Sequence, residues 1–429
     1  MTNSSDIHHA GTARQAPIKH MLLRLRGPVL AVLDQALYAL SNLMLQVLVA
    51  RSVTEDAFGA FTVATSLFVI LAMAHQTILV EPMFVLGPRH YSRELGRYYD
   101  ILRGRWSAGA GLGAMMLCLL SAWAFRQWES TEIALCMIAY ALAAPLILYF
   151  WLMRRMAFAL LRIDLAVIAN GIYCTIMLLS LAGFMLVGLA NAYSGIALSA
   201  AASLVGALII RMRLPWPQRG QDQPGGVFRE HLQYGRWAFG SEVLSWGIAN
   251  CAMLILPIWM GLATSALLRI LILLFMPMLQ ICSVMALLLL RRSAKASPEI
   301  SQSRGALRHC LIFLAAGSAY GIGVVLLAPP LIPLVFGSQY VVEPGWILLA
   351  AVSGAFTVGA QPLFTALRAA ERPRDVMIAH MVAFILIISL LYGLEDAGIA
   401  GALIAQTVGW LAAMLSAIFF LARLDRHLA

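Results

Sequence analysis

The chain has 429 residues, of which 61% are hydrophobic and only 12% are charged. An average soluble domain carries roughly 25% charged residues, so this composition excludes an ordinary soluble domain. The net charge of +10 does not indicate nucleic-acid binding, because basic residues also hold loops on the cytoplasmic side of a membrane, and no basic repeat is interleaved with aromatic residues.

Hydrophobic residues gather in twelve blocks, each about twenty residues long. Such a block crosses roughly 30 Å of hydrocarbon as a helix, which satisfies its own backbone amides. The sequence therefore predicts an all-α integral membrane protein with about twelve transmembrane helices. The predicted spans are 28–50, 57–80, 106–125, 131–153, 164–187, 190–210, 237–260, 264–290, 309–328, 346–367, 375–393 and 397–421.

Polar segments divide these spans into two groups of six. Residues 1–27 are polar and basic and are expected to form a cytoplasmic N-terminal segment. The stretch 211–236 is rich in Pro, Gly, Gln and Arg, which indicates a solvated linker. It separates an N-lobe, 28–210, from a C-lobe, 237–429.

The loop charges predict the orientation. With a cytoplasmic N-terminus, 27 of the 30 Lys and Arg residues lie in cytoplasmic segments, including three in 154–163. The exoplasmic loops then hold Arg51 and Arg126, and Arg269 lies within a span. Because basic residues are retained on the cytoplasmic side, this asymmetry predicts a multi-pass protein of the cytoplasmic (inner) membrane with both termini inside.

Two spans share a polar pattern that suggests an internal repeat. Asp34 and Asn42 in the first span are eight residues apart, as are Glu242 and Asn250 in the seventh. Eight residues are a little over two helical turns, so acid and amide share one face. The spacing fits parallel six-helix repeats about an axis along the membrane normal. Chance placement of a few polar residues would also explain it.

Arg269 is the basic residue that lies deepest in a predicted span. A guanidinium near the middle of a membrane costs about 2.5–3.5 kcal/mol on insertion scales, so it should face the bundle interior or a wet cavity. There it could bind a diphosphate or a sugar through its fork of donors. It could instead extend to the exoplasmic interface, which is about five residues away along the helix.

Two acids are further candidates for a cavity. Asp34 begins a polar stripe that continues through Asn42 and Gln46, so the first span needs a wet or hydrogen-bonding neighbour. Asp34 and Glu242 could relay a proton or cation, or accept sugar hydroxyls. Either could instead be held by an Arg at the cytoplasmic rim, such as Arg236 for Glu242.

Prolines mark candidate hinges and helix ends. Pro82 lies at a helix end, whereas Pro277 and Pro362 lie inside spans, where proline frees a carbonyl and permits a kink. The longest exoplasmic loop is predicted at 329–345. Its three prolines, between 329 and 333, are expected to stop the ninth span at residue 328.

Other chemistries find no support in the sequence. There is no HxxH or CxxC spacing, so no metal site is predicted, and no GxxxxGK[ST] motif for ATP hydrolysis. No cofactor and no enzymatic activity are predicted. Transport would draw on an ion gradient (proton or sodium), on the substrate gradient, or on removal of the product by polymerisation.

Four stretches in order resemble the bacterial polysaccharide transporters, the Wzx-type oligosaccharide flippases. In that family an Arg closes the first helix and an acidic Phe-Gly turn opens the second, a Phe-Gly-x-x-Tyr loop follows the ninth helix, and small residues open the twelfth. The corresponding stretches are Arg51 to Phe61, Phe336 to Tyr340, Leu367 to Arg374, and Gly398 to Ala402. Glu371 stands where the third stretch of the family usually has Gly.

The resemblance implies two six-helix lobes around a central cavity. It also implies transport of a polyprenyl-diphosphate-linked oligosaccharide for exopolysaccharide, capsule or O-antigen assembly, with polymerase and chain-length machinery as partners beside membrane lipids. Arg269 would then contact the diphosphate. Arg51 would lie at the cavity mouth, unless it is an interface anchor paired with Glu55 or Asp56.

Two other functions stay open. The same superfamily contains multidrug/cation antiporters, which would favour an acidic, aromatic-lined cavity. A membrane polysaccharide polymerase or glycosyltransferase is the remaining alternative, although such enzymes usually carry a large exoplasmic loop and every predicted exoplasmic loop here is short.

Overall fold

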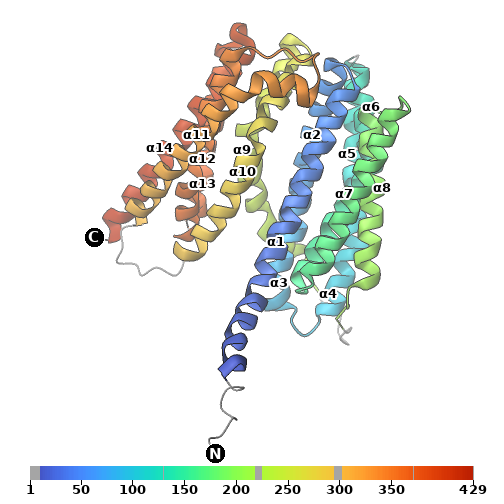
Figure 1. The fold of residues 1–429 in the computed structure, drawn as a ribbon, viewed down its shortest axis with the longest axis vertical. Coiled ribbons are helices and arrows are strands. Elements are labelled where there is room, and N and C mark those ends of the chain that lie inside the picture. Colours follow the sequence, from blue (N-terminus) through green and yellow to red (C-terminus); the bar gives the residue numbers. More distant parts are fainter. Residues whose placement is uncertain (1–9, 129, 218–224, 294–301, 371, 429) are drawn as a thin grey trace, which may run out of the picture.

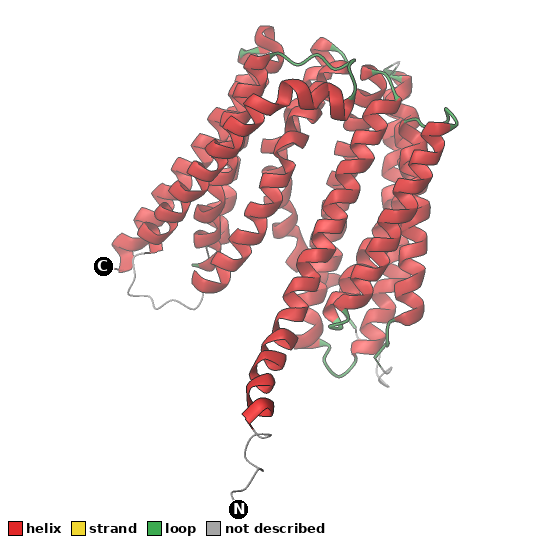
Figure 2. Cartoon of the chain, in the orientation of Figure 1, coloured by secondary structure: helices red, strands yellow, loops and turns green. Residues whose placement is uncertain are grey.

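The computed structural model describes residues 10–128, 130–217, 225–293, 302–370 and 372–428. Every regular element in these ranges is helical, as Figure 2 shows. Within these described ranges, twelve helices or runs of joined helices are long and apolar enough to cross a membrane. The predicted all-α membrane fold with about twelve spans is therefore confirmed.

The N-lobe contains the first six spans, two of which are interrupted by a single π-helical turn, η1 and η2. Polar caps fix several helix starts: the Thr54 hydroxyl accepts a hydrogen bond from the Ala57 amide at the start of α2. The elements are α1 (Ala10–Ser52), α2 (Glu55–His75), η1 (Gln76–Val80), α3 (Glu81–His90), α4 (Leu95–Ile101), η2 (Leu102–Trp106), α5 (Ser107–Gln127), α6 (Thr131–Ala159), α7 (Ile163–Leu186) and α8 (Ala192–Arg213).

The C-lobe contains the other six spans. Gly261, with φ of 84°, ends the first of its helices in the left-handed region, which glycine adopts without steric cost. The elements are α9 (Val227–Met260), α10 (Ala263–Ser293), α11 (Gln302–Phe336), α12 (Pro344–Ala369), α13 (Pro373–Gly393), the 3₁₀ turn η3 (Glu395–Ala397) and α14 (Gly398–Leu428).

The two lobes pack their helices in the same pattern. In the N-lobe, α6 contacts α2, α5 and α8, while α7 contacts α1 and α8. In the C-lobe, α12 contacts α10, α11 and α14, while α13 contacts α9 and α14. Figure 1 shows the N-lobe in blue to green beside the C-lobe in yellow to red. Each helix of one lobe thus has a counterpart with equivalent neighbours in the other.

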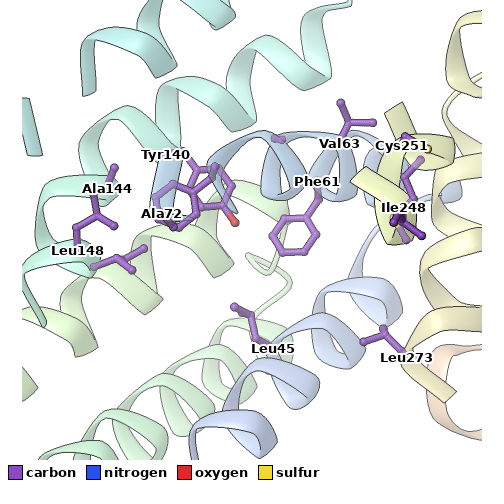
Figure 3. Close-up of a cluster of buried hydrophobic side chains, with 14 of the residues drawn as sticks. Leu45, Phe61, Val63, Ala72, Tyr140, Ala144, Leu148, Ile248, Cys251 and Leu273 are labelled. Atoms are coloured by element: carbon purple, nitrogen blue, oxygen red, sulfur yellow. The ribbon is translucent and has the colours of Figure 1, made fainter. Parts of the chain in front are cut away.

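Helix α2 carries much of the hydrophobic contact between the lobes. Figure 3 shows Phe61 and Val63 of α2 among buried side chains that include Tyr140 from α6 and Ile248 from α9. Phe61 and Ile248 are each 1% exposed. One continuous core therefore runs from the N-lobe through α2 into the C-lobe.

The first turns of α9 lie against the N-lobe. His231 is fully buried, with its Nδ1 3.0 Å from the carbonyl oxygen of Ile78 and its Nε2 2.8 Å from the hydroxyl of Tyr98. Part of the predicted linker 211–236 is therefore helical and packed. Residues 218–224 of that segment lie outside the described residues.

Two expectations about loops are wrong. Helix α11 continues to Phe336 through the prolines at 329–333, although the ninth span was predicted to stop at 328. A membrane helix tolerates proline where nearby groups satisfy the freed backbone. Helix α6 likewise continues to Ala159, so Arg154 is a buried helical residue and not part of a cytoplasmic loop.

Candidate functional site

A first cavity of about 320 Å³ lies between α2 and the C-lobe helices α9, α10, α12 and α14. Its walls mix aromatic rings, small apolar residues and polar groups. The polar and aromatic lining residues are Thr65, Ser66, Trp246, Asn250, Arg269, Phe275, Ser353, Thr357, Gln406 and Trp410. Arg269 is the charged residue of this lining, and it is half-buried.

Arg269 links the two lobes across this cavity. Its Nε donates a hydrogen bond to the side-chain oxygen of Gln46, so α10 of the C-lobe is held against α1 of the N-lobe. Both residues are site candidates predicted from the sequence, and the structure brings them together. Because this bond uses one guanidinium edge, the other donors of Arg269 remain available to a ligand in the cavity.

A second cavity of about 320 Å³ lies within the N-lobe, between α1, α2, η1 and α6. Val69 of α2 lines both this cavity and the first, so the two adjoin. The second cavity carries two adjacent guanidinium groups, Arg154 and Arg155, with Gln35, Gln76, Tyr38 and Trp151 nearby in the lining.

Asp34 is buried beside this second cavity and is held by an arginine. Its Oδ2 accepts from the guanidinium of Arg154 at 2.5 Å, and the two side chains are 2% and 8% exposed. The guanidinium carbon of Arg154 also lies 4.6 Å from the centre of the Tyr38 ring. The Asn170 side chain donates to the Asp34 backbone carbonyl at 2.7 Å. Asp34 is therefore held in a buried network of side chains.

Three atoms of that network have no hydrogen-bond partner among the described residues: Asp34 Oδ1, Arg154 Nε and the Asn170 side-chain oxygen. A buried polar atom without a partner costs free energy. Two acceptors and one donor of the network could therefore bind a further ligand. That ligand would have to approach from the side of the cavity that Arg154 lines.

A third cavity of about 850 Å³ lies at the ends of α3, α9, α12 and α13. It is lined by acids and bases together, with Glu81 and Glu242 beside Arg368 and Arg374. Glu242 is half-buried, and Arg368 and Arg374 are exposed. The cavity is therefore wet and charged, and its charged groups keep access to solvent.

The two predicted asparagines form intrahelical bonds. Asn42 donates to the carbonyl of Tyr38 at 3.0 Å, and Asn250 donates to the carbonyl of Trp246 at 3.0 Å. Asn250 also lines the first cavity, whereas Asn42 is not among the lining residues of the three cavities. In this conformation the amide of Asn250 is the one that a ligand could reach.

The lobes are joined at the end opposite the third cavity. The Tyr340 hydroxyl donates to the Ala50 carbonyl at 3.0 Å, and the Gln339 amide donates to the same carbonyl at 3.0 Å. Arg51 donates to the carbonyl of Leu334 at 3.0 Å, in the last turn of α11, where that carbonyl has no helical partner. We call these contacts between residues 50–53 and 334–340 the terminal seal.

A second contact closes the same end. The backbone amide of Ala263, at the start of α10, donates to the Asp56 carboxylate at 3.1 Å. Gly59 lies so close to the backbone of Leu262 that an added Cβ would be 1.9 Å from the Leu262 oxygen. Glycine is therefore required where α2 crosses the start of α10.

The three hinge candidates have different surroundings. Pro82 is buried and follows η1, where the second span changes from α2 to α3. Pro362 is buried inside α12, and Pro277 is exposed inside α10. Their role as hinges stays a prediction.

Sequence reasoning missed Arg154, Asn170 and Arg368. Arg154 and Arg368 each lie near the end of a span, where basic residues are usually loop anchors. The repeat also includes an aromatic residue midway between the acid and the asparagine. The two sets are Asp34, Tyr38 and Asn42, and Glu242, Trp246 and Asn250. The aromatic position would have strengthened the repeat, but the partner arginines are too distant in sequence to be found by spacing.

The fold is similar to those of solved membrane transporters. An inward-facing multidrug resistance MATE family transporter of the MOP superfamily gives a TM-score of 0.73 at 13% identity, over 93% of this chain and 100% of that chain. The lipid II flippase MurJ, in an inward closed conformation, gives 0.61 at 14% identity, over 91% and 87%. An outward-facing MATE family transporter of the MOP superfamily gives 0.52 at 14% identity, over 93% and 94%.

No protein-family model and no curated protein matches the sequence. At these identities the likeness defines the fold: the chain is a multi-pass membrane protein with the fold of MOP-superfamily transporters. The likeness supports the fold that the sequence resemblance implied, and the solved structures above are transporters and a flippase.

Proposed function

We propose that this protein is a flippase that moves a polyprenyl-diphosphate-linked oligosaccharide across the bacterial cytoplasmic membrane by alternating access. It would supply exopolysaccharide, capsule or O-antigen assembly. The observation that carries the proposal is the charge of the three cavities: apart from Arg154, whose charge Asp34 neutralises, their lining includes Arg155, Arg269, Arg368 and Arg374 against the acids Glu81 and Glu242. Guanidinium groups suit a diphosphate, because their planar fork matches two phosphate oxygens at once.

The arrangement of the cavities suits stepwise entry from one side. The wide, charged third cavity lies at the end where the predicted cytoplasmic segments gather, and the terminal seal closes the opposite end. A diphosphate would first meet Arg368 and Arg374 and then the deeper Arg269. Opening of the seal and closure of the third cavity would complete the transport cycle.

A multidrug/cation antiporter is the second candidate, because a multidrug resistance transporter has a similar fold. A cationic drug or a coupling cation needs a free carboxylate in the cleft. Asp34 is neutralised by Arg154 and is 1% exposed, so it offers no such group in this conformation. Glu81 and Glu242 share their cavity with two arginines. Net positive charge therefore favours an anionic substrate.

Complementation tests the proposed function. The gene would be expressed in a bacterial strain that lacks its oligosaccharide flippase, and both surface polysaccharide and lipid-linked intermediates would be measured. We expect surface polysaccharide to return and the intermediates to fall. Drug-efflux activity of the same cells towards cationic dyes, with no effect on the intermediates, would contradict the proposal and favour the antiporter.

The orientation can be tested on the same chain. All six native cysteines are buried and free, so a single exposed cysteine reports cleanly. Met212, in the last turn of α8, is 83% exposed, and Val341 is 77% exposed beside the terminal seal. A membrane-impermeant maleimide added to intact cells should label Val341→Cys and spare Met212→Cys. The reverse result would invert the proposed topology.

A further inference from the structure

An apolar groove of about 500 Å³ lies on the outside of the N-lobe, away from the cleft between the lobes. Its floor and walls come from α2, η1, η2, α5, α6 and the first turn of α9. The residues that line it are Leu71, Ala74, His75, Ile78, Leu79, Arg105, Trp106, Gly109, Ala110, Gly113, Ala114, Leu117, Leu148 and Phe228. Because α5 forms one wall with its exposed face, the groove opens towards the lipid.

Both π-helical turns of the structure border this groove. η1 supplies Ile78 and Leu79, and η2 supplies Arg105 and Trp106. Single π-helical turns interrupt the regular hydrogen-bond ladder and occur often at functional sites. The carbonyl of Ile78, within η1, is bound by the ring of His231 instead. Two irregular turns from separate spans thus meet at one groove.

The groove is open because α5 carries glycines on that face. A Cβ added to Gly109 or to Gly113 would meet no atom within 4 Å. Neither helix packing nor a positive φ requires glycine at these two positions. Glycine inside a helix costs about 1 kcal/mol relative to alanine, so an open groove is the feature that these two residues provide.

Two polar groups belong to an otherwise apolar lining. His75 is 5% exposed, and neither ring nitrogen has a hydrogen-bond partner among the described residues. Arg105 is exposed and has no ion-pair partner there, whereas its neighbour Arg103 is paired with Asp100 and lies 4.0 Å from the centre of the Trp216 ring. Among the described residues, Arg105 is thus an unpaired cation at the rim of the groove, and His75 is an unsatisfied hydrogen-bonding ring inside it.

We infer that this groove binds one anionic glycerophospholipid of the surrounding membrane. The phosphate would pair with Arg105, an ester carbonyl would accept from a ring N–H of His75, and one acyl chain would lie along Gly109, Gly113 and Leu117. A single ligand then satisfies the exposed cation, the buried ring and the apolar wall.

Two observations favour a phospholipid over the polyprenyl chain of a transport substrate. A group the size of a water molecule occupies about 30 Å³, so 500 Å³ holds roughly fifteen to twenty such groups. One acyl chain fits that volume, and a polyprenyl carrier is several times longer. A polyprenyl phosphate also has no ester carbonyl for His75.

Native mass spectrometry of the full-length protein, released from detergent, tests this inference. The probes are phosphatidylglycerol with ester-linked chains, its ether-linked analogue, phosphatidylcholine and a polyprenyl monophosphate. The key variant is Gly113→Leu, which fills the groove without meeting any protein atom at its Cβ. Gly323→Leu is the matched control, because a Cβ there also meets nothing within 4 Å and α11 lies outside the groove.

We expect the wild type and Gly323→Leu to retain one phosphatidylglycerol. Gly113→Leu and Arg105→Gln should each bind it at least about tenfold more weakly. That is the size expected for loss of the acyl-chain site or of a charge-assisted hydrogen bond. The ether analogue should bind the wild type several-fold more weakly than the ester. Equal retention by Gly113→Leu, equal binding of phosphatidylcholine, or displacement by equimolar polyprenyl phosphate would overturn the inference.

Discussion

The two lobes place the same kind of residues at corresponding positions and use them differently. In the N-lobe, Asp34 of α1 pairs with Arg154 of α6, and both are buried. In the C-lobe, Glu242 of α9 and Arg368 of α12 line one wide cavity, where the acid is half-buried and the arginine exposed. The N-lobe pair joins helices, whereas the C-lobe groups remain able to meet a ligand.

This difference shows how one helix pattern can serve two roles. A buried ion pair loses its water and is held by direct contact, so it fixes α1 against α6. Charged groups in a wet cavity are screened and can exchange partners. The N-lobe pair is therefore a fixed contact between two helices, and the charged groups of the third cavity can exchange partners.

Replacement of Arg154 should give the largest effect. Arg154→Met leaves Asp34 buried without its partner, which costs about 3–5 kcal/mol. We expect a strong fall in the yield of folded protein and in its thermal stability, measured by fluorescence-detected size exclusion. The double variant Asp34→Leu/Arg154→Met should recover most of the loss, because it removes both charges.

Arg368→Met is the matched control in the C-lobe. Arg368 is exposed, so its loss should leave folded yield and thermal stability near those of the wild type. If Arg368→Met destabilised the protein as much as Arg154→Met, the distinction between a buried ion pair in the N-lobe and exposed charged groups in the C-lobe would be wrong.

Replacement of Arg269 should give the next largest effect, on transport. Loss of a charge-assisted contact with a diphosphate costs about 1.5–3 kcal/mol, or about ten- to a hundredfold in binding. We expect Arg269→Ala to insert normally and to export little polysaccharide per inserted protein. Arg269→Lys should be only partly active, because an ammonium lacks the planar fork.

Gln46→Leu is the control for the contact between the lobes. It removes the acceptor of Arg269 but keeps the guanidinium in the cavity. Export close to wild type by Arg269→Ala at equal protein level would remove Arg269 from the substrate site. Equal losses in Gln46→Leu and Arg269→Ala would instead assign Arg269 to holding the lobes together.

A smaller effect is expected at the terminal seal. Tyr340→Phe removes the hydroxyl that donates to the Ala50 carbonyl, a bond worth about 1 kcal/mol. The sealed conformation is then less stable, so the open form should be about fivefold more populated. The readout is the rate at which impermeant maleimide labels a cysteine at Ala50, which is fully buried here.

Tyr392→Phe, at an exposed position of α13 outside the seal, is the reference for that experiment. Its labelling rate should match that of the parent protein. If Tyr340→Phe is labelled no faster than Tyr392→Phe, the hydrogen bond to the Ala50 carbonyl does not stabilise the terminal seal.

The smallest effect is expected for Glu242→Gln. This acid is half-buried in a wet cavity, so the change should alter the free energy of unfolding by no more than about 0.5 kcal/mol. Asp34→Asn should cost several times as much, because it leaves Arg154 charged and unpaired. Thermal melting of both variants in one detergent gives the comparison, and equal costs would contradict it.

Hydropathy and loop charge were sufficient to predict the twelve spans. The bilayer sets the length of each segment and requires its backbone N–H and C=O groups to be hydrogen-bonded within the protein. The contact between Arg269 and Gln46 was within reach, since both are polar residues inside spans and must find polar neighbours. The partner of Asp34 could not be predicted from the sequence. Arg154 is 120 residues away and has the sequence appearance of a loop anchor.

The ends of helices were the least predictable part. Prolines at 329–333 do not stop α11, and His231, inside a segment of polar composition, is fully buried on the N-lobe. Tertiary partners are found at both places: Tyr98 binds the ring of His231 at the start of α9, and Arg51 binds the Leu334 carbonyl at the end of α11. Such partners are set by the fold and not by local composition.

Binding of the proposed substrate to the purified protein tests the central claim most directly. A polyprenyl-diphosphate oligosaccharide and a cationic dye would be titrated separately against the protein in lipid nanodiscs, with the wild type, Arg269→Lys and Arg269→Ala compared. We predict that diphosphate binding weakens from the wild type to Arg269→Lys to Arg269→Ala, and that the dye binds weakly to all three proteins. Tight dye binding, or diphosphate binding that is equal in all three proteins, would contradict it.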